Sequence, residues 1–465
     1  MRGARFFGGL LLLFLGGCSS LQTQKTQYAG IDRLLEKANY SKAISQVKLA
    51  REKKAYTHKD RVLYFLDLGM LLHWNQQYEQ SNLMLEKAER AIEQNLTKSL
   101  SRSATSLILN DNLLPYAGEG YENVYLNAFK ALNYLALGQT DNAFVEIRRI
   151  DLKLVELQKR YPDLAKKLNQ AEESAGAFRA GPQVFVTSPL GRYLGMALYR
   201  NDQKWDDARI DLKKLIAAWQ VQPALLPFPA PRLKNALKPP PESQARLELL
   251  VFTGRSPEKK AHTYFIHTEK DRLVLAHSAE NYLGAMALDD LSYIPWKDIP
   301  EDYHFKIQLP EMKKNASKVS YVEVEIAGYS PSRLQRLESL ENAAVSTFSA
   351  KKPLIFLRTV IRAVSKGLAA SSAKQEMTKN MDETLAFFVR LASDLLLDST
   401  ENADLRSARF FPAEAFVYER FLPKGAYHLF IRYYSERGRL LYTDEKLNVS
   451  LHPGKLNFIE SAYLN

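Results

Sequence analysis

Acidic and tyrosine side chains crowd one short stretch of the sequence, from about Asp111 to Tyr134, and these residue types suit binding chemistry. A tyrosine joins a rigid apolar ring to a polar hydroxyl group, which suits a groove that holds a peptide or a glycan. The candidate partner-binding residues are Asp111, Tyr116, Glu119, Tyr121, Glu122 and Tyr125. The alternative is structural: the tyrosines cap a stack of helices and the loop only bridges them. The sequence leaves both interpretations open.

Recognisable catalytic motifs are missing from the sequence. It contains no His-Glu-x-x-His zinc motif, no glycine-rich phosphate loop and no Gly-x-Ser-x-Gly nucleophile elbow. His262 and His267 are five residues apart on a predicted strand, so they face opposite sides and cannot share a metal ion. We therefore expect no metal, no cofactor and no catalytic residue. Two converging carboxylates, as in a glycosidase, are the enzymatic arrangement that the sequence leaves open.

The single cysteine, Cys18, ends an N-terminal export signal. Two arginines precede an apolar run at residues 6–15, which is shorter than the roughly 20 residues of a membrane-spanning helix. Leu15-Gly16-Gly17-Cys18 resembles the lipobox of bacterial lipoproteins, in which the cysteine is acylated and becomes the new N-terminus. The resemblance implies a lipid anchor on Cys18, and Ser19 after it implies transfer to the periplasmic face of the outer membrane.

The chain has 465 residues and a formal net charge of +12. Export removes the usual target of a basic protein, so we expect no nucleic-acid partner. Attraction to anionic lipid headgroups or to cell-wall polymer is the functional alternative to a simply solvated basic surface. With one cysteine, neither an internal disulfide framework nor a cysteine-based zinc site can form.

The first half of the sequence carries repeated helical hairpins with a tetratricopeptide-like pattern. Residues 62–90 place the small residue Gly69 where two antiparallel helices must approach closely. Similar patterns surround Tyr40, Ala131 and Trp205. Each hairpin exposes an apolar face that only the next hairpin can cover, so the repeats predict a curved solenoid with a concave side. An irregular helical domain with accidental matches is the alternative.

A proline-rich linker separates these helices from a second half with a different periodicity. Runs such as Leu247–Phe252 and Tyr427–Tyr433 predict strands, and a helical hairpin is expected to interrupt them. The predicted class is α+β, a tetratricopeptide-like (TPR-like) α-solenoid followed by a β-sandwich-like domain with an inserted helical hairpin. The predicted segments are a signal peptide at 1–18, a tether at 19–30, the solenoid at 31–220, the linker at 221–245, the β-rich domain at 246–465 and its helical insert at about 354–397.

Two blocks of residues carry a family resemblance. The first holds Asn110-Asp111, Pro115-Tyr116, Gly118, Tyr121-Glu122, Asn127 and Ala131 to Leu135, and the second holds Asp404 to Ser407, Phe411-Pro412, Arg420, Leu422-Pro423 and Gly425 to Tyr427. They resemble an uncharacterised family of bacterial outer-membrane lipoproteins with tetratricopeptide-like repeats, although a larger aromatic residue is expected where Ala408 stands. The resemblance spans nearly the whole chain and implies lipoprotein identity and location, but no activity.

Two functions from different classes follow from these features. The first is a lipid-anchored periplasmic scaffold or adaptor, not an enzyme, that binds another cell-envelope protein through the TPR-like groove. The alternative is a protein that acts on peptidoglycan or binds it. An inner wall of the solenoid that is open would favour the first function, and one filled by the chain itself would weaken it.

Overall fold

The computed structural model describes residues 28–101, 111–171, 179–280, 286–295, 301, 304–370 and 402–465. The predicted signal peptide, Cys18 and the tether up to residue 27 lie outside the described residues. The chain is an α+β protein in which a helical region precedes a β-rich region, as the sequence predicts. Among the described residues, no helix is both long and apolar enough to cross a membrane.

The helical region is built from antiparallel pairs of helices, each pair joined by a short turn. The helices are α2 (Tyr40–Glu52), α3 (Arg61–Trp74), α4 (Tyr78–Ser101), α6 (Gly120–Ala136), α7 (Thr140–Ala171), α8 (Pro189–Asn201) and α9 (Trp205–Val221). Short 3₁₀ turns lie at His58–Asp60, Asp111–Leu113 and Pro223–Leu225. The pairs α3/α4, α6/α7 and α8/α9 fall on the predicted hairpins.

The close approach of α3 and α4 depends on Gly69. A Cβ atom at this position would lie 2.8 Å from the Leu85 side chain, well inside van der Waals contact. The Ser81 hydroxyl donates a hydrogen bond to the Gly69 carbonyl oxygen at 2.8 Å. The small residues of the repeat pattern are therefore the ones that let the paired backbones meet.

The β-rich region contains three four-stranded sheets, ordered β12-β1-β9-β8, β11-β10-β6-β7 and β4-β3-β2-β5 among the described residues. The first five strands are β1 (Gln244–Thr253), β2 (Glu258–Glu269), β3 (Arg272–Glu280), β4 (Met286–Pro295) and β5 (His304–Lys313). The others are β6 (Tyr321–Ile326), β7 (Ser332–Arg333), β8 (Gln335–Ser339), β9 (Glu414–Pro423), β10 (Gly425–Tyr434), β11 (Leu440–Leu451) and β12 (Asn457–Tyr463). The β1/β12 pair is parallel and the other paired strands are antiparallel.

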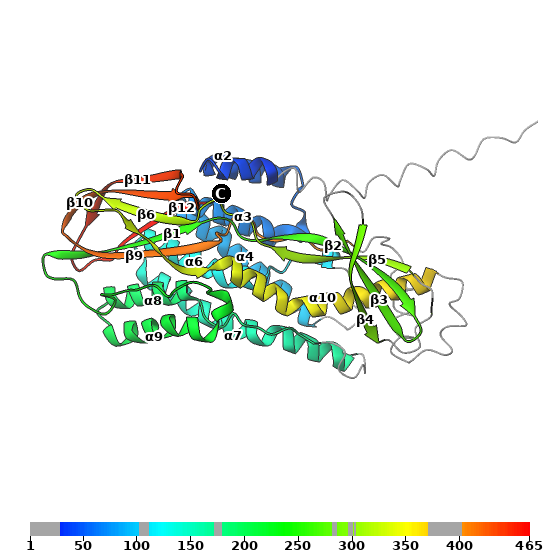
Figure 1. The fold of residues 1–465 in the computed structure, drawn as a ribbon. Helices are drawn as coiled ribbons and strands as arrows, with labels where there is room; N and C mark the ends of the chain where they lie inside the picture. The colour runs from blue at the N-terminus through cyan, green and yellow to red at the C-terminus, as the bar shows by residue number, and fades with distance from the viewer. Residues whose placement is uncertain are drawn as a thin grey trace, which may run out of the picture.

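The long helix α10 (Leu340–Ala370) follows β8 directly and precedes β9 in the chain. It begins fourteen residues before the predicted start of the helical insert, because Leu340 and the residues after it already pack in the main core. Residues 371–401 lie outside the described residues, so the second arm of the predicted hairpin is untested. Figure 1 shows α10 running lengthwise toward the β2–β5 sheet, at the end of the molecule opposite β10 and β11.

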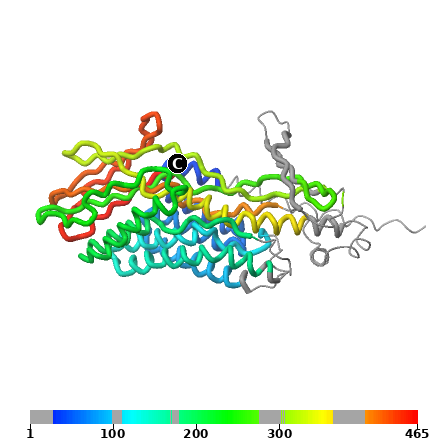
Figure 2. The backbone as a smooth tube through the Cα atoms, turned by 60° about the horizontal axis from the view of Figure 1, so that its bottom comes forward, coloured from blue at the N-terminus to red at the C-terminus, as the bar shows by residue number. Residues whose placement is uncertain are grey.

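Strand β1 is buried on both faces and so fixes the order of the layers. Its alternate residues Leu247, Leu249 and Val251 pack in a hydrophobic cluster with β6 and β10, while Leu250 and Phe252 pack with the helices. Successive side chains of a strand point to opposite faces, so one strand can contribute to both clusters. Figure 2 shows the helices gathered on one side of the molecule and the strands on the other.

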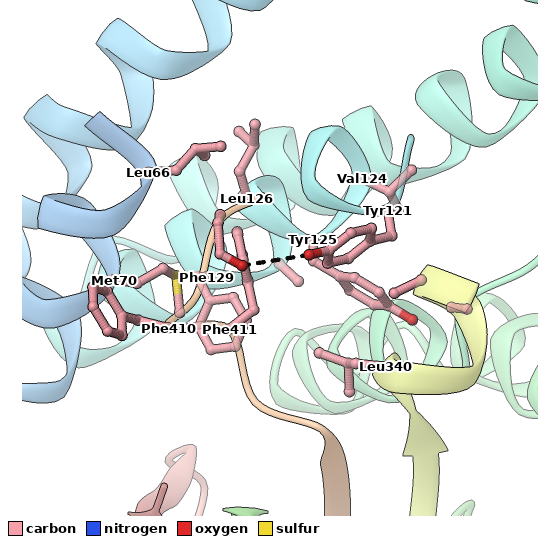
Figure 3. Packing of buried hydrophobic residues seen from close by; sticks show 14 of the residues in the cluster. Leu66, Met70, Tyr121, Val124, Tyr125, Leu126, Phe129, Leu340, Phe410 and Phe411 are labelled. Atoms are coloured by element: carbon pink, nitrogen blue, oxygen red, sulfur yellow. Dashed lines mark hydrogen bonds between the residues drawn. The ribbon is translucent and has the colours of Figure 1, made fainter. Parts of the chain in front are cut away.

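The two halves of the chain share one hydrophobic core, although the sequence suggests a proline-rich linker between separate units. Its cluster of buried residues extends from Tyr28 in the helical region to Leu464 near the C-terminus. Phe129 of α6 lies at its centre, with ring centroids 5.3 Å from Phe252 and 5.7 Å from Phe411. Figure 3 shows side chains of α3, α6, α10 and residues 410–411 converging there. The inner side of the helices is therefore filled by the chain itself.

Truncation of Phe129 tests this shared core. We expect Phe129→Ala to lower the free energy of unfolding by about 3–5 kcal/mol, because a buried ring is lost and leaves a cavity. Val155→Ala, at a half-exposed position of α7, is the control and should change it by less than about 0.5 kcal/mol. Urea unfolding followed by far-UV circular dichroism should give one transition in both variants. Separate transitions for the helical and β-rich halves would contradict a common core.

Candidate functional site

Five of the six predicted binding residues are buried, and Asp111 is partly exposed. Tyr121, Glu122 and Tyr125 are fully buried in α6. The Tyr125 hydroxyl donates to the Glu338 carboxylate at 2.7 Å. Helix α6 is covered by the chain on all sides from Gly120 to Asn133, so its tyrosines become core residues. For these three residues, direct contact with a partner stays a prediction, and the structure places their side chains in the core.

Glu122 holds the start of α6 to a distant segment. It is the third residue of the helix, and its carboxylate accepts the backbone N–H of Glu119 at 2.8 Å, which completes a capping box. The same carboxylate accepts the backbone N–H of Ala408 at 2.6 Å and the Tyr116 hydroxyl at 2.8 Å. Burial and, to a smaller extent, the nearby charge of Glu119 raise the pKa of Glu122 to about 7.

Two other buried carboxylates repeat this arrangement. Asp67 accepts the hydroxyls of Tyr28 and Tyr56 and, at 3.0 Å, the backbone N–H of Arg409. Burial raises the pKa of Asp67 to about 6. In the third case the Glu338 carboxylate accepts the Tyr125 hydroxyl together with the Ser188 hydroxyl and the Leu190 backbone N–H, both at 2.7 Å. Each carboxylate thus joins segments far apart in sequence, which is a structural task.

A cavity of about 940 Å³ lies beside this core, between α4, α7, residues 111–119, the first half of α10 and residues 404–406. It brings together Asp111, Tyr116 and Glu119 from the predicted binding stretch, while Tyr121, Glu122 and Tyr125 do not line it. Sequence reasoning missed the basic wall. The cationic residues that line the cavity are Arg90 of α4, Arg149, Lys153, Lys159 and Arg160 of α7, Lys351 and Arg358 of α10, and Arg406.

One end of the cavity is built around Glu119 and Asp111. Glu119 forms ion pairs with Lys259 at 2.5 Å and with Lys351 at 3.0 Å. Burial opposes the ionisation of Glu119, but the two ammonium groups outweigh it and hold its pKa below the ordinary value. Asp111 pairs with Arg358 at 3.1 Å. These pairs tie the residues before α6 to α10, which no local sequence pattern reveals.

The other end is built around Glu89 of α4. Its carboxylate pairs with Lys130 of α6 at 2.7 Å, with Lys153 of α7, and with Arg149 at 3.4 Å. Burial opposes ionisation here too, but Lys153 and Lys130 lower the pKa of Glu89 to about 2. The side-chain amide of Asn127, on α6, donates a hydrogen bond to the Glu89 carboxylate at 2.9 Å. These ion pairs join α4 to α7 and both helices to α6, which forms the floor of the cavity between them.

The floor retains unused hydrogen-bonding capacity at Asn123. This side chain is 3% exposed and lines the cavity. The described residues supply no hydrogen-bond partner for its Oδ1. A buried amide oxygen without a partner is costly, so an N–H group of a ligand would stabilise it.

The charges of the cavity are balanced. Eight cationic and eight acidic side chains line it, together with apolar residues such as Leu152, Leu354 and Ile355. A polyanion would meet as many like charges as opposite ones. The lining therefore suits a ligand that carries both signs of charge and some apolar surface.

Acid–base catalysis finds no support in the pair Glu119 and Glu122. The two carboxylates have pKa values shifted in opposite directions, as in catalytic pairs. Glu122, however, does not line the cavity, and both of its oxygens accept backbone N–H groups. It cannot reach a substrate. The described part of the chain also contains no group of three or more His, Cys, Asp or Glu residues that could hold a metal ion.

Comparisons with protein-family models, curated proteins and solved structures found no match to the chain.

The raised pKa of Glu338 predicts a pH dependence of stability. Its carboxyl group has an ordinary pKa of 4.5, and burial raises the folded-state pKa to about 7. The contribution of this residue is therefore complete below about pH 4.5 and is lost as the pH rises through about 7. The loss from this one group is on the order of 3 kcal/mol. Glu122, Asp67 and Glu414 act in the same direction.

We expect Glu338→Gln to flatten the fall in unfolding free energy between pH 5 and pH 8, because the amide does not ionise. Chemical denaturation at the two pH values measures this difference. Glu436→Gln, at an exposed position, is the control for loss of one carboxylate and should leave the slope as in the unchanged protein. An unchanged slope in Glu338→Gln would show that Glu338 binds no extra proton in the folded state.

Proposed function

We propose that the protein is a lipid-anchored periplasmic adaptor that binds an extended segment of another cell-envelope protein. The binding site is the charge-balanced cavity between α4, α7 and α10, with Asn123 on its floor. This cavity carries the proposal, because the inner side of the helices is occupied by the chain's own residues. The groove first expected from the repeats is thus replaced by a site on the opposite side of α6.

The dimensions of the cavity suit a short extended peptide. Its α4 wall runs from Glu86 to Thr97, a rise of about 17 Å at about 1.5 Å per residue. An extended chain of about five residues covers the same length at about 3.3 Å per residue. A peptide also supplies backbone N–H groups for Asn123 and can carry both acidic and basic side chains. A mixed-charge segment therefore matches the lining.

The location and the finer fold are part of the same proposal. The lipobox-like run at Cys18 and the family resemblance support an anchor in the outer membrane, facing the periplasm. We infer that the pairs α3/α4, α6/α7 and α8/α9 are tetratricopeptide-like repeats. The apolar cluster shared by β1, β6, β9 and β10 supports a β-sandwich-like arrangement of two of the sheets. A binding module on a lipid tether can hold a partner near the membrane.

Peptidoglycan is the second candidate ligand. Its short peptides also carry ammonium and carboxylate groups, so the balanced charge of the cavity fits them as well. Sedimentation of the purified protein with isolated cell-wall sacculi distinguishes this candidate from a protein partner.

Photocrosslinking from the cavity tests the adaptor proposal. Leu152 is 63% exposed and lines the cavity, whereas Ile210 of α9 is 52% exposed and does not line it. A photoreactive amino acid at position 152 should form a defined crosslink to one envelope protein in intact cells. The same group at position 210 should not, because it lies away from the ligand.

Two results would count against the adaptor. Equal crosslinking from positions 152 and 210 would show that the cavity is not the contact surface. Sedimentation with sacculi that is lost when Asn123 is replaced by Leu would assign the cavity to peptidoglycan instead.

Replacement of Cys18 tests the anchor. Cys18→Ser should abolish incorporation of radiolabelled fatty acid and remove the protein from the outer-membrane fraction, because no thiol is left to acylate. Ser20→Ala, two residues away, is the control and should remain anchored. Retention of Cys18→Ser in the outer membrane would contradict a lipid anchor at this residue.

A further inference from the structure

A pair of histidines on the β2–β5 sheet forms a second candidate site, outside the peptide cavity. His267 of β2 lies directly opposite His304 of β5 in the antiparallel register. Directly opposed residues of neighbouring strands project from the same face, so the two side chains meet. Their ring centroids are 4.4 Å apart, with 41° between the ring planes.

One nitrogen of this pair has no hydrogen-bond partner in the described part of the chain. Nδ1 of His267 is buried, and the described residues provide no hydrogen bond to it. An unpaired buried nitrogen costs free energy, which a ligand bound to it would recover. His304 is exposed at the edge strand, so an ion from solvent can reach the pair.

We propose that His267 and His304 chelate one divalent transition-metal ion, Zn²⁺ or Cu²⁺. Imidazole nitrogens are preferred ligands of both ions. Bonds of about 2.0–2.1 Å let a single ion bridge two nitrogens up to about 4 Å apart. Water molecules complete the coordination, since no third His, Cys, Asp or Glu among the described residues joins the pair in a metal-binding group.

The neighbouring charges on this face allow such a site. Glu269, two residues along β2 from His267, is paired with Arg272 and stays outside the proposed coordination shell. Lys306, two residues along β5 from His304, is exposed and can turn away from a bound cation. His262 faces the other side of β2, where it pairs with Glu311 at 2.6 Å. The partner of His267 is therefore the residue across the sheet, and not the histidine nearest in sequence.

Metal titration of the tag-free chain tests the proposal. Cys18→Ser in every sample removes the single thiol, a competing ligand. Calorimetry with Zn²⁺ should show one ion per chain. His267→Ala and His304→Ala should each weaken binding by about tenfold or more, equivalent to about 1.4 kcal/mol. His452→Ala, at an exposed turn position, should leave binding unchanged.

Electron paramagnetic resonance with Cu²⁺ provides a readout that a loss of folding cannot imitate. The unchanged site should show coupling to two imidazole nitrogens, and His304→Ala should show coupling to one. Binding that is as tight in His267→Ala and His304→Ala as in the control would overturn the proposal. A spectrum of His304→Ala that still shows coupling to two imidazole nitrogens would also overturn it. The same holds if the chain with both histidines binds no stoichiometric Zn²⁺.

Discussion

The burial of helix α6 is the constraint on which the rest of the structure depends. Every residue from Gly120 to Asn133 is buried, although the helix carries apolar residues on one side and polar residues on the other. Its aromatic side packs against Phe252 of β1 and against Phe410 and Phe411, which come from the far end of the chain. Each fully buried aromatic side chain stabilises the fold by roughly 1.5–3 kcal/mol. The helical half therefore depends on residues that the β-rich half supplies.

The polar side of α6 explains why a charged cavity lies beside an apolar core. Asn123, Asn127, Lys130 and Asn133 follow one another at helical spacing and face α4 and α7. A buried polar group must be hydrogen-bonded or ion-paired, so the neighbouring helices present glutamates and basic residues to this side. Near the start of α6, Asn123 lines the cavity, and the described residues supply no partner for its Oδ1. The same row of α6 side chains thus supplies the hydrogen bonds and ion pairs that hold the helices together and the Asn123 amide oxygen that can bind a ligand.

The sequence predicts the local elements of this fold well. Small residues such as Gly69 mark the helix pairs, and alternating apolar residues mark the strands, because both patterns are set by backbone geometry alone. It does not predict what covers the helices. Residues 408–411 contact α6 across nearly 300 positions of sequence, and no periodic pattern records such a contact.

The candidate site was predictable in part for the same reason. The stretch from Asp111 to Glu119 is visible as an unusual cluster of acids and tyrosines, and it does line the cavity. The composition of this stretch cannot show that Tyr121 and Tyr125 are buried, because tyrosine is common both in cores and on binding surfaces. The basic partners on α10 and at Arg406 depend on tertiary packing.

The most direct test of the central claim is the folding of residues 28–221 alone. The helices in this fragment cover their own apolar faces only in part, and Phe252, Phe410 and Phe411 are missing from it. We predict a fragment with no cooperative thermal transition that binds a hydrophobic dye, and recovery of a cooperative transition when residues 222–465 are added. A fragment that unfolds cooperatively by itself, without binding the dye, would contradict a core shared by the two halves.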